Sequence, residues 1–255
     1  MSQPIILARK QRVATLTIDR PPLNILDIET IQELESLLRN LGEEPDLQVV
    51  VLQGAGEKAF SAGVAIEDHT AERVPTMLTH FHGALSVLRD LPAVTLAAVQ
   101  GHCLGGGMEL AACCDLIVAA DDSRFGQPEI ELGCYPPLAA ALYPALLGNP
   151  RTADLLLTGR ILDGGQAQAM GLVSRLVKRE ELSASLDELV ASITAHSLVV
   201  TRLTKRAIRA GRDHDFADAL AASERIYLEE LIETHDMHEG LAAFLEKRPP
   251  DWQHR

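Results

Sequence analysis

The sequence has few aromatic residues, few cysteines and no surplus of positive charge. Aromatic residues make up 4% of the 255 residues, whereas hydrophobic residues make up 47%. We therefore expect a core built from Ala, Leu, Ile and Val. Charged residues make up 23%, and this ordinary balance excludes disordered, collagen-like and coiled-coil classes. A chain of this length buries enough surface to fold without a disulfide or a metal.

Basic residues number 23 and acidic residues 36, which gives a formal net charge of −13. Binding to nucleic acid requires a dense basic patch, and no segment of the chain supplies one. Solubility alone accounts for the acidic surplus. We expect no nucleic-acid partner.

The four cysteines lie among apolar or small residues and form no Cys-x-x-Cys pair; they are Cys103, Cys113, Cys114 and Cys134. Two adjacent cysteines are a poor spacing for a disulfide or for zinc. The pattern predicts buried thiols in a reducing compartment.

Apolar segments long enough for a leader or a membrane span are also missing. The first ten residues contain no apolar block before a cleavage site. The longest apolar stretch, residues 93–120, is interrupted by polar residues that include Gln100, Glu109 and Asp115, so it does not predict a membrane span. We expect a cytoplasmic protein that has no membrane partner.

Apolar strands alternate with helices through the first three-quarters of the chain. Strands are predicted at residues 12–20, 47–52, 94–99 and 116–120, and helices at 28–41 and 75–91. The strands are continuously apolar, which indicates a parallel sheet covered on both faces. Beyond about residue 180 the pattern is helical, with helices predicted at 182–195, 198–210, 216–232 and 237–245. The sequence predicts an α/β body at residues 1–195 and a helical region at 196–255.

Three glycines at residues 105–107 lead directly into a predicted helix at 108–114. The start of a helix carries unpaired N–H groups, and glycine lets a ligand approach them closely, so this turn can hold an oxyanion. Glu109 lies in the first turn among apolar neighbours. A carboxylate there is costly unless it is paired or used. The alternative is a glutamate that is stabilised only by the helix dipole or by a salt bridge near the helix start.

Two further segments carry candidate chemistry. Glu129 follows Pro128 in a predicted loop, where an exposed glutamate would be commonplace. Together with Glu109, however, it can divide the work of acid and base. Residues 59–66 (AFSAGVAI) follow an apolar strand and either form an ordinary turn or supply the second N–H group that an oxyanion hole needs.

Several other chemistries lack their motifs. His69, His80 and His82 lie near one another in sequence but form no ligand set, so we expect no metal site. Ser61 is not in a Gly-x-Ser-x-Gly motif, which leaves a nucleophile-elbow hydrolase unsupported. The glycines at 105–107 match neither Gly-x-Gly-x-x-Gly nor a P-loop, so a dinucleotide or nucleotide site is not indicated.

Four segments in order resemble the enoyl-CoA hydratase/isomerase, or crotonase, family: residues 60–63 (FSAG), 105–111 (GGGMELA), 114–115 (CD) and 125–129 (FGQPE). The resemblance extends from Arg12 to Trp252. It implies a spiral of strand–strand–helix units with a C-terminal helical trimerisation region. It also implies an acyl-CoA substrate, a homotrimer or a hexamer made of two trimers, no metal, and no cofactor apart from the coenzyme A of the substrate.

The resemblance further implies roles for individual residues. The backbone N–H groups of Val64 and Gly106 would hold the thioester oxygen, and Glu109 and Glu129 match the two catalytic glutamates of the hydratases. The residues implied at the coenzyme A are Ala62, Ile66, Phe244 and Lys247, of which the last two would reach the coenzyme A of a neighbouring subunit. The acyl pocket would be bordered by Tyr135, Pro137 and Leu138.

Two departures from the family pattern bear on the substrate. Ala65 stands where the family often has an acidic residue, and residues 133–144 (GCYPPLAAALYP) replace a glycine-rich loop. With residues 68–70 (DHT), these features are closer to the family's cyclohexa-1,5-diene-1-carbonyl-CoA hydratases. Prolines stiffen a loop and added carbons remove volume. The predicted loop at 135–143 therefore favours a compact or cyclic acyl group.

The sequence thus predicts a lyase that hydrates an enoyl-CoA or dienoyl-CoA. One alternative is a double-bond isomerase, which usually needs one carboxylate where this chain has two. Another is a non-catalytic family member that binds acyl-CoA or RNA. The net charge speaks against RNA, and the pair of glutamates speaks against a catalytically inactive scaffold.

Overall fold

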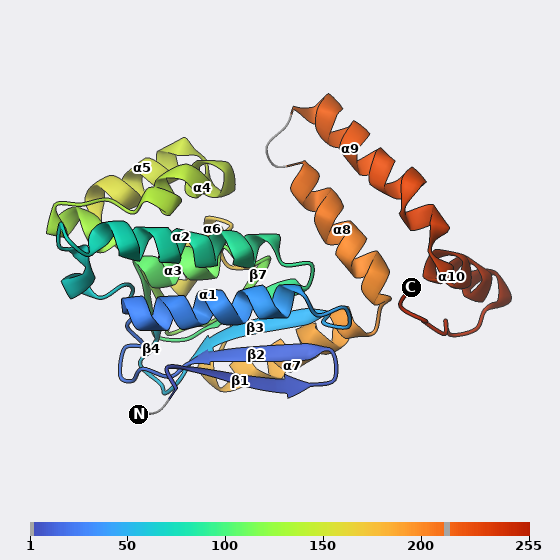
Figure 1. The fold of residues 1–255 in the computed structure, drawn as a ribbon, viewed down its shortest axis with the longest axis horizontal. Helices are drawn as coiled ribbons and strands as arrows, with labels where there is room; N and C mark the ends of the chain where they lie inside the picture. The colour runs from blue at the N-terminus through green and yellow to red at the C-terminus, as the bar shows by residue number, and fades with distance from the viewer. Residues whose placement is uncertain (1–2, 212–214) are drawn as a thin grey trace.

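Two β-sheets form the body of the chain, of which the computed structural model describes residues 3–211 and 215–255 (Figure 1). The larger sheet has the order β1-β2-β3-β5-β7-β10, and the smaller has the order β4-β6-β8-β9. Two pairs, β1 with β2 and β8 with β9, are antiparallel, and the other named pairs are parallel. The strands are β1 (Ile5–Lys10), β2 (Val13–Ile18), β3 (Val49–Gly54), β4 (Ala59–Ser61), β5 (Val94–Val99), β6 (His102–Leu104), β7 (Leu116–Ala120), β8 (Arg124–Gly126), β9 (Ile161–Asp163) and β10 (Arg175–Val177).

From β3 to β8, consecutive strands contribute alternately to the two sheets. β3, β5 and β7 lie in the larger sheet, and each is followed by a short strand of the smaller sheet, namely β4, β6 and β8. A helix follows the first two of these pairs, α2 (Val74–Asp90) after β4 and α3 (Gly106–Ala112) after β6. The predicted spiral of strand–strand–helix units is therefore confirmed.

The central strands are apolar along their length because helices cover both faces of the larger sheet. Figure 1 shows α1 (Ile28–Gly42), α2 and α3 on one face and α7 (Leu182–Thr194) on the other. Val50 and Leu52 of β3 pack in the cluster that contains α1 and α2, while Val49 and Val51 pack with α7. The alternating side chains of one strand thus enter two separate cores.

Several predicted elements are confirmed closely. The strands expected at 94–99 and 116–120 coincide with β5 and β7. The helix expected at 28–41 is α1, and its N-cap is Asp27, which accepts a hydrogen bond from the N–H of Thr30 at 2.9 Å. The helix expected at 108–114 begins two residues earlier as α3, because the glycines form its first turn. The sequence predicts no strand at β1, β4, β6, β8, β9 or β10.

The expectation of a loop at residues 135–143 is wrong, because Pro137–Leu147 forms helix α4. Pro137 is the first residue of this helix, where its missing N–H removes no helical hydrogen bond. Alanine and leucine, which favour helix, fill most of the next positions. Helix α4 packs against α5 (Asn149–Thr158), and the two lie above α2 in Figure 1.

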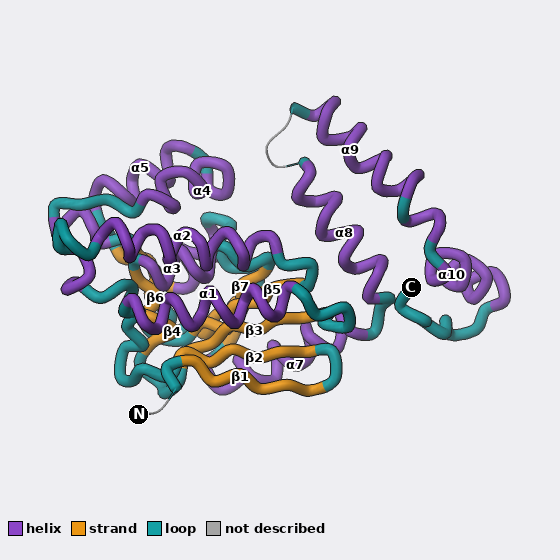
Figure 2. The backbone as a smooth tube through the Cα atoms, viewed as in Figure 1, coloured by secondary structure: helices purple, strands orange, loops and turns teal. Residues whose placement is uncertain are grey.

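The C-terminal region is helical, as predicted, and extends away from the sheets (Figure 2). It comprises α8 (Leu198–Ala210), α9 (Phe216–Glu229) and α10 (His235–Glu246). Lys205 connects α8 to the body, since its Nζ lies 2.5 Å from Oδ2 of Asp115 and donates to the carbonyl of Ala93. The remaining elements are α6 (Gly164–Ala169) and four short 3₁₀ helices, η1 (Ile66–His69), η2 (Pro128–Leu132), η3 (Arg179–Glu181) and η4 (Leu231–Glu233). Residues 1–2 of the predicted α/β body and residues 212–214 of the predicted helical region lie outside the described residues.

The cysteines remain thiols, as predicted, although only three of them are buried and Cys134 is partly exposed. In the described part of the chain, no helix is both long and apolar enough to cross a membrane. The same residues include no cluster of three or more His, Cys, Asp or Glu suited to a metal ion.

Candidate active site

A cavity of about 490 Å³ brings together the three segments that the sequence singled out. Its walls come from the chain just after β4, the start of α3, the segment η2 and one side of α2. The candidate residues that line it are Ala62, Val64, Ile66, Gly106, Glu109, Glu129, Tyr135 and Pro137. Residues separated by up to 75 positions in the sequence therefore share one space.

Glycine allows α3 to begin directly against the segment that follows β4. A Cβ on Gly107 would lie 2.3 Å from the carbonyl oxygen of Ser61, which no side chain tolerates. Gly63 has a φ of +104°, and a Cβ there would lie 3.3 Å from the backbone nitrogen of Gly106. Larger residues at these positions would separate the two segments, so the local geometry depends on glycine.

The backbone N–H groups of Val64 and Gly106 lie at this junction and have no acceptor. Gly106 is the first residue of α3, so its N–H has no partner within the helix. Across residues 3–211 and 215–255, neither N–H donates a hydrogen bond to another group of the protein. Two free donors beside one cavity are suited to a carbonyl oxygen that gains negative charge.

Glu109 projects into the cavity from the first turn of α3 and is 3% exposed. The N–H of Ala139, in the first turn of α4, donates a hydrogen bond of 2.8 Å to its Oε1. Burial raises the pKa of Glu109 to about 7, and the negative charge of Glu129 contributes to the same shift. The Glu109 carboxyl is therefore able to exchange a proton near neutral pH.

Glu129 reaches the same cavity from η2. Its Oε1 lies where a side chain on residue 105 would otherwise be, since a Cβ on Gly105 would come within 2.8 Å of it. Burial raises the pKa of Glu129 to about 7. Two interacting carboxyls with raised pKa values can hold one proton between them, so that one acts as base and the other as acid.

Gln127 and Tyr143 support Glu129, and the sequence analysis gave neither a role. Both side chains are fully buried. In the amide orientation that satisfies all three groups, Nε2 of Gln127 donates to the two Glu129 oxygens at 3.0 and 3.1 Å, and its Oε1 accepts from the Tyr143 hydroxyl at 2.7 Å. Burial raises the pKa of Tyr143 far above its usual value, so its hydroxyl remains a donor.

A signal for Gln127 was present in the sequence, because it stands two residues before Glu129 in the segment 125–129. No such signal existed for Tyr143. It lies in the stretch that was expected to be a loop, and only the fold of α4 brings its hydroxyl to Gln127.

Three of the candidate residues lie outside the cavity. Leu138 lines a neighbouring groove between α2 and α4. Phe244 and Lys247 lie on α10 and at its C-terminal end, whereas the residues that line the cavity run from Ala62 to Pro137. In Figure 1, α10 is at the opposite end of the molecule from the start of α4.

Known proteins share both the sequence and the fold. The model of the enoyl-CoA hydratase/isomerase family matches residues 8–255. The chain is 38% identical to the cyclohexa-1,5-dienecarbonyl-CoA hydratase of Thauera aromatica, over 98% of this chain and 96% of that protein. It is 33% identical to the crotonyl-CoA hydratase of Syntrophomonas wolfei, over 96% of this chain and 95% of that one. The structure of an enoyl-CoA hydratase from Bacillus anthracis matches with a TM-score of 0.94 at 32% identity, and the match covers 99% of this chain and 100% of that one.

Replacing Glu109 by Gln is expected to stabilise the protein more at pH 8 than at pH 5. A carboxyl whose pKa is raised by folding keeps its proton where the unfolded chain has lost it. Its contribution to stability is complete below pH 4.5 and is lost as the pH rises through about 7. The full shift corresponds to a loss on the order of 3 kcal/mol.

Urea unfolding of the wild type and of Glu109→Gln at both pH values measures this difference. The exposed Glu188, on α7, provides a control as Glu188→Gln, which should follow the wild type. An identical pH dependence for all three proteins would show that Glu109 titrates normally.

Proposed function

The chain belongs to the enoyl-CoA hydratase/isomerase family, as the four sequence segments predicted, and we propose that it is a hydratase. It would add water to the conjugated double bond of an enoyl-CoA thioester, or remove water in the reverse direction. The observation that carries this proposal is the pair of carboxyls with raised pKa values in one cavity, beside two unpaired N–H groups. An isomerase needs one such carboxyl and a binding protein needs none, so the pair favours hydration over both.

The proposed reaction begins with the thioester carbonyl bound by the N–H groups of Val64 and Gly106. These donors draw electron density from the conjugated double bond and stabilise the negative charge that develops on the oxygen. Glu109, in its ionised form, takes a proton from water as the water oxygen bonds to the β-carbon. Glu129, in its protonated form, gives its proton to the α-carbon.

Gln127 holds the Glu129 carboxyl in one orientation, and Ala139 does the same for Glu109. The two groups therefore need little rearrangement when the substrate enters. Removing either hydrogen bond would leave the distance between carboxyl and substrate free to vary, and proton transfer depends strongly on that distance.

We assign coenzyme A to the side of the cavity at Ala62 and Ile66, and the acyl group to the side at Tyr135 and Pro137. Ile66 is an exposed large apolar residue beside the cavity, as expected of a surface that a ligand covers. Phe244, which is 82% exposed, and Lys247 are far from the cavity of their own chain. Their proposed contact with coenzyme A therefore requires a neighbouring subunit.

Among substrates whose acyl group carries no charge, we propose that the acyl group is short or cyclic. The consecutive residues Pro136 and Pro137 stiffen the acyl side of the cavity, and the relative from Thauera aromatica is named for a cyclic dienoyl-CoA.

Loss of conjugated absorbance, with products identified by mass, gives kcat/KM for cyclohexa-1,5-dienecarbonyl-CoA, crotonyl-CoA and a ten-carbon 2-enoyl-CoA. We expect kcat/KM for the cyclic dienoyl-CoA or for crotonyl-CoA to exceed that for the ten-carbon substrate. A preference for the ten-carbon substrate would contradict the proposed acyl group. If none of the three thioesters were hydrated, the proposed function would be wrong.

Glu109→Gln and Glu129→Gln are each expected to lower kcat by a factor of about 10² or more, because each removes a group that transfers a proton. Glutamine is nearly the same size, so folding should persist, which circular dichroism checks. Glu131→Gln is the control, since Glu131 is an exposed glutamate on the same segment η2. Full activity in either of the first two variants would remove that residue from the mechanism.

The assembly is proposed to be a homotrimer or a hexamer of two trimers, formed through the C-terminal helices. These helices expose large apolar side chains, including Phe216, Leu220, Leu228, Phe244 and Leu245. Several large apolar side chains exposed on one helical region favour a protein interface there. Sedimentation equilibrium at micromolar concentration should give three or six times the mass of the chain, and a stable monomer would contradict the proposal.

A further inference from the structure

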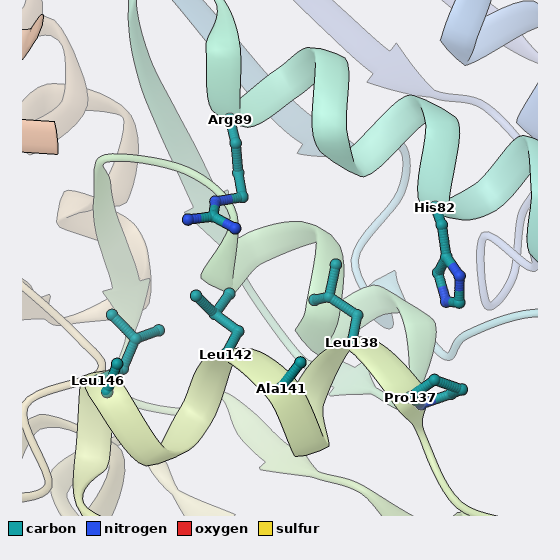
Figure 3. Close-up of a pocket in the computed structure, with 8 residues that line it drawn as sticks. His82, Arg89, Pro137, Leu138, Ala141, Leu142 and Leu146 are labelled. Carbon is teal, nitrogen blue, oxygen red and sulfur yellow. The ribbon is translucent and has the colours of Figure 1, made fainter. Parts of the chain in front are cut away.

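A second groove of about 450 Å³ lies between α2 and α4, next to the candidate active-site cavity (Figure 3). His82 and Pro137 line both spaces. The rest of the groove is apolar on the side of α4, where it is lined by Leu138, Ala141, Leu142, Ala145 and Leu146. An acyl group that passes Pro137 on leaving the cavity would therefore enter an apolar channel.

Arg89 is the one charged side chain among the residues that line this groove. It comes from the last turn of α2, and Figure 3 shows its guanidinium directed across the groove toward α4, near Leu142. Among residues 3–211 and 215–255, no carboxylate or carbonyl group accepts a hydrogen bond or forms an ion pair with it. The guanidinium thus lacks a counter-charge within the described chain.

His82 is the other titratable residue in the groove. Burial lowers the pKa of His82, so its ring is neutral at neutral pH. Its Nε2 is buried and has no hydrogen-bond partner in the described structure. The groove therefore carries one positive charge, no negative charge and one unused polar atom at the end that it shares with the cavity.

The spacing along α2 determines where a ligand would carry its charge. Arg89 follows His82 by seven residues, which places it about 10 Å farther along the helix. A ligand that enters from the cavity would contact the leucines of α4 before it reaches the guanidinium. It would need an apolar body and an anionic group at its far end.

We propose that this groove binds the distal part of the acyl group and that Arg89 binds a carboxylate there. The inference rests on the proposed hydratase function, and it names a substrate class: 2-enoyl-CoA thioesters whose acyl chain ends in a carboxylate. A guanidinium and a carboxylate form charge-assisted hydrogen bonds. A neutral chain of equal length would instead place a methyl group against Arg89 and displace its water without replacing the lost contacts. Short and cyclic acyl groups stay within the cavity and do not reach the groove.

Matched pairs of substrates test this proposal. Each pair consists of a 2-enoyl-CoA that ends in a methyl group and one of the same length that ends in a carboxylate, at six, eight, ten and twelve carbons. At one or more lengths, kcat/KM for the carboxylate member is expected to exceed that of its partner by about tenfold, the ratio given by one charge-assisted hydrogen bond. A preference for the methyl-ended member at every length would overturn the proposal.

Variants show whether Arg89 causes the preference. Arg89→Met should abolish it and Arg89→Lys should retain most of it. The exposed Ala145 allows a second test, because Ala145→Glu adds a negative charge to the groove and Ala145→Gln adds the same bulk without charge. The glutamate variant should abolish the preference, because its carboxylate neutralises Arg89, whereas the glutamine variant should keep it. Each result is a ratio of two substrates on one protein, so a general loss of activity cancels.

Failure of this inference is distinguishable from failure of the hydratase function. Hydration of crotonyl-CoA by the wild type reports the function, and the substrate ratios report the groove. If crotonyl-CoA were not hydrated, calorimetric binding of the matched saturated acyl-CoAs would still measure the preference for a terminal carboxylate. A shift in sedimentation in the Arg89 variants, without a change in the ratios, would assign the groove to contact with another copy of the chain and overturn the proposal.

Discussion

The close contact between the start of α3 and the chain after β4 is the constraint on which the candidate site depends. It exists because Gly107 places hydrogen, and no carbon, against the carbonyl of Ser61. That contact brings the N–H groups of Val64 and Gly106 to one place, and it fixes Glu109 one turn farther along the helix. Gly105 leaves the space that the Glu129 carboxyl occupies. A run of three glycines thereby positions all four groups of the proposed mechanism.

The same packing removes water from the two carboxyls, and this has opposite effects on stability and reactivity. Dehydration raises the pKa values of Glu109 and Glu129 and so makes proton exchange possible near neutral pH. It also means that the folded chain bears the cost of ionising a buried group. Hydrogen bonds from Ala139 to Glu109 and from Gln127 to Glu129 offset part of that cost.

Much of the fold followed from local sequence signals. The strands at 94–99 and 116–120 were predictable because continuous apolar runs are bounded by polar residues, and α1 because Asp27 precedes a regular apolar spacing. Strand β1 was missed because it ends in exposed, charged residues such as Arg9 and Lys10, and pairing with β2 makes it a strand. The sequence does not predict helix α4, because consecutive prolines are typical of a loop, although Pro137 begins the helix.

The candidate site was predictable in its parts but not in its assembly. Glu109 and Glu129 could be chosen because each stands in an unusual local setting. Their convergence depends on two sheets that no local pattern encodes, and so does the network from Tyr143 through Gln127 to Glu129. The groove at Arg89 is another product of packing, because it exists only where α4 lies across α2. Tyr143 and Arg89 act only through tertiary contacts, and no local pattern in the sequence marks either of them.

Helix α4 has two connections at once, since Ala139 donates to Glu109 while Leu138 and Leu142 line the groove. The position of α4 therefore affects both the proton affinity of Glu109 and the shape of the groove. By thermodynamic reciprocity, a ligand that shifts α4 alters how tightly Glu109 holds its proton, and the loss of that proton alters how tightly the ligand is held by the same factor. Under the proposed function, recognition of the far end of a substrate and the ionisation of the base would then form one coupled equilibrium.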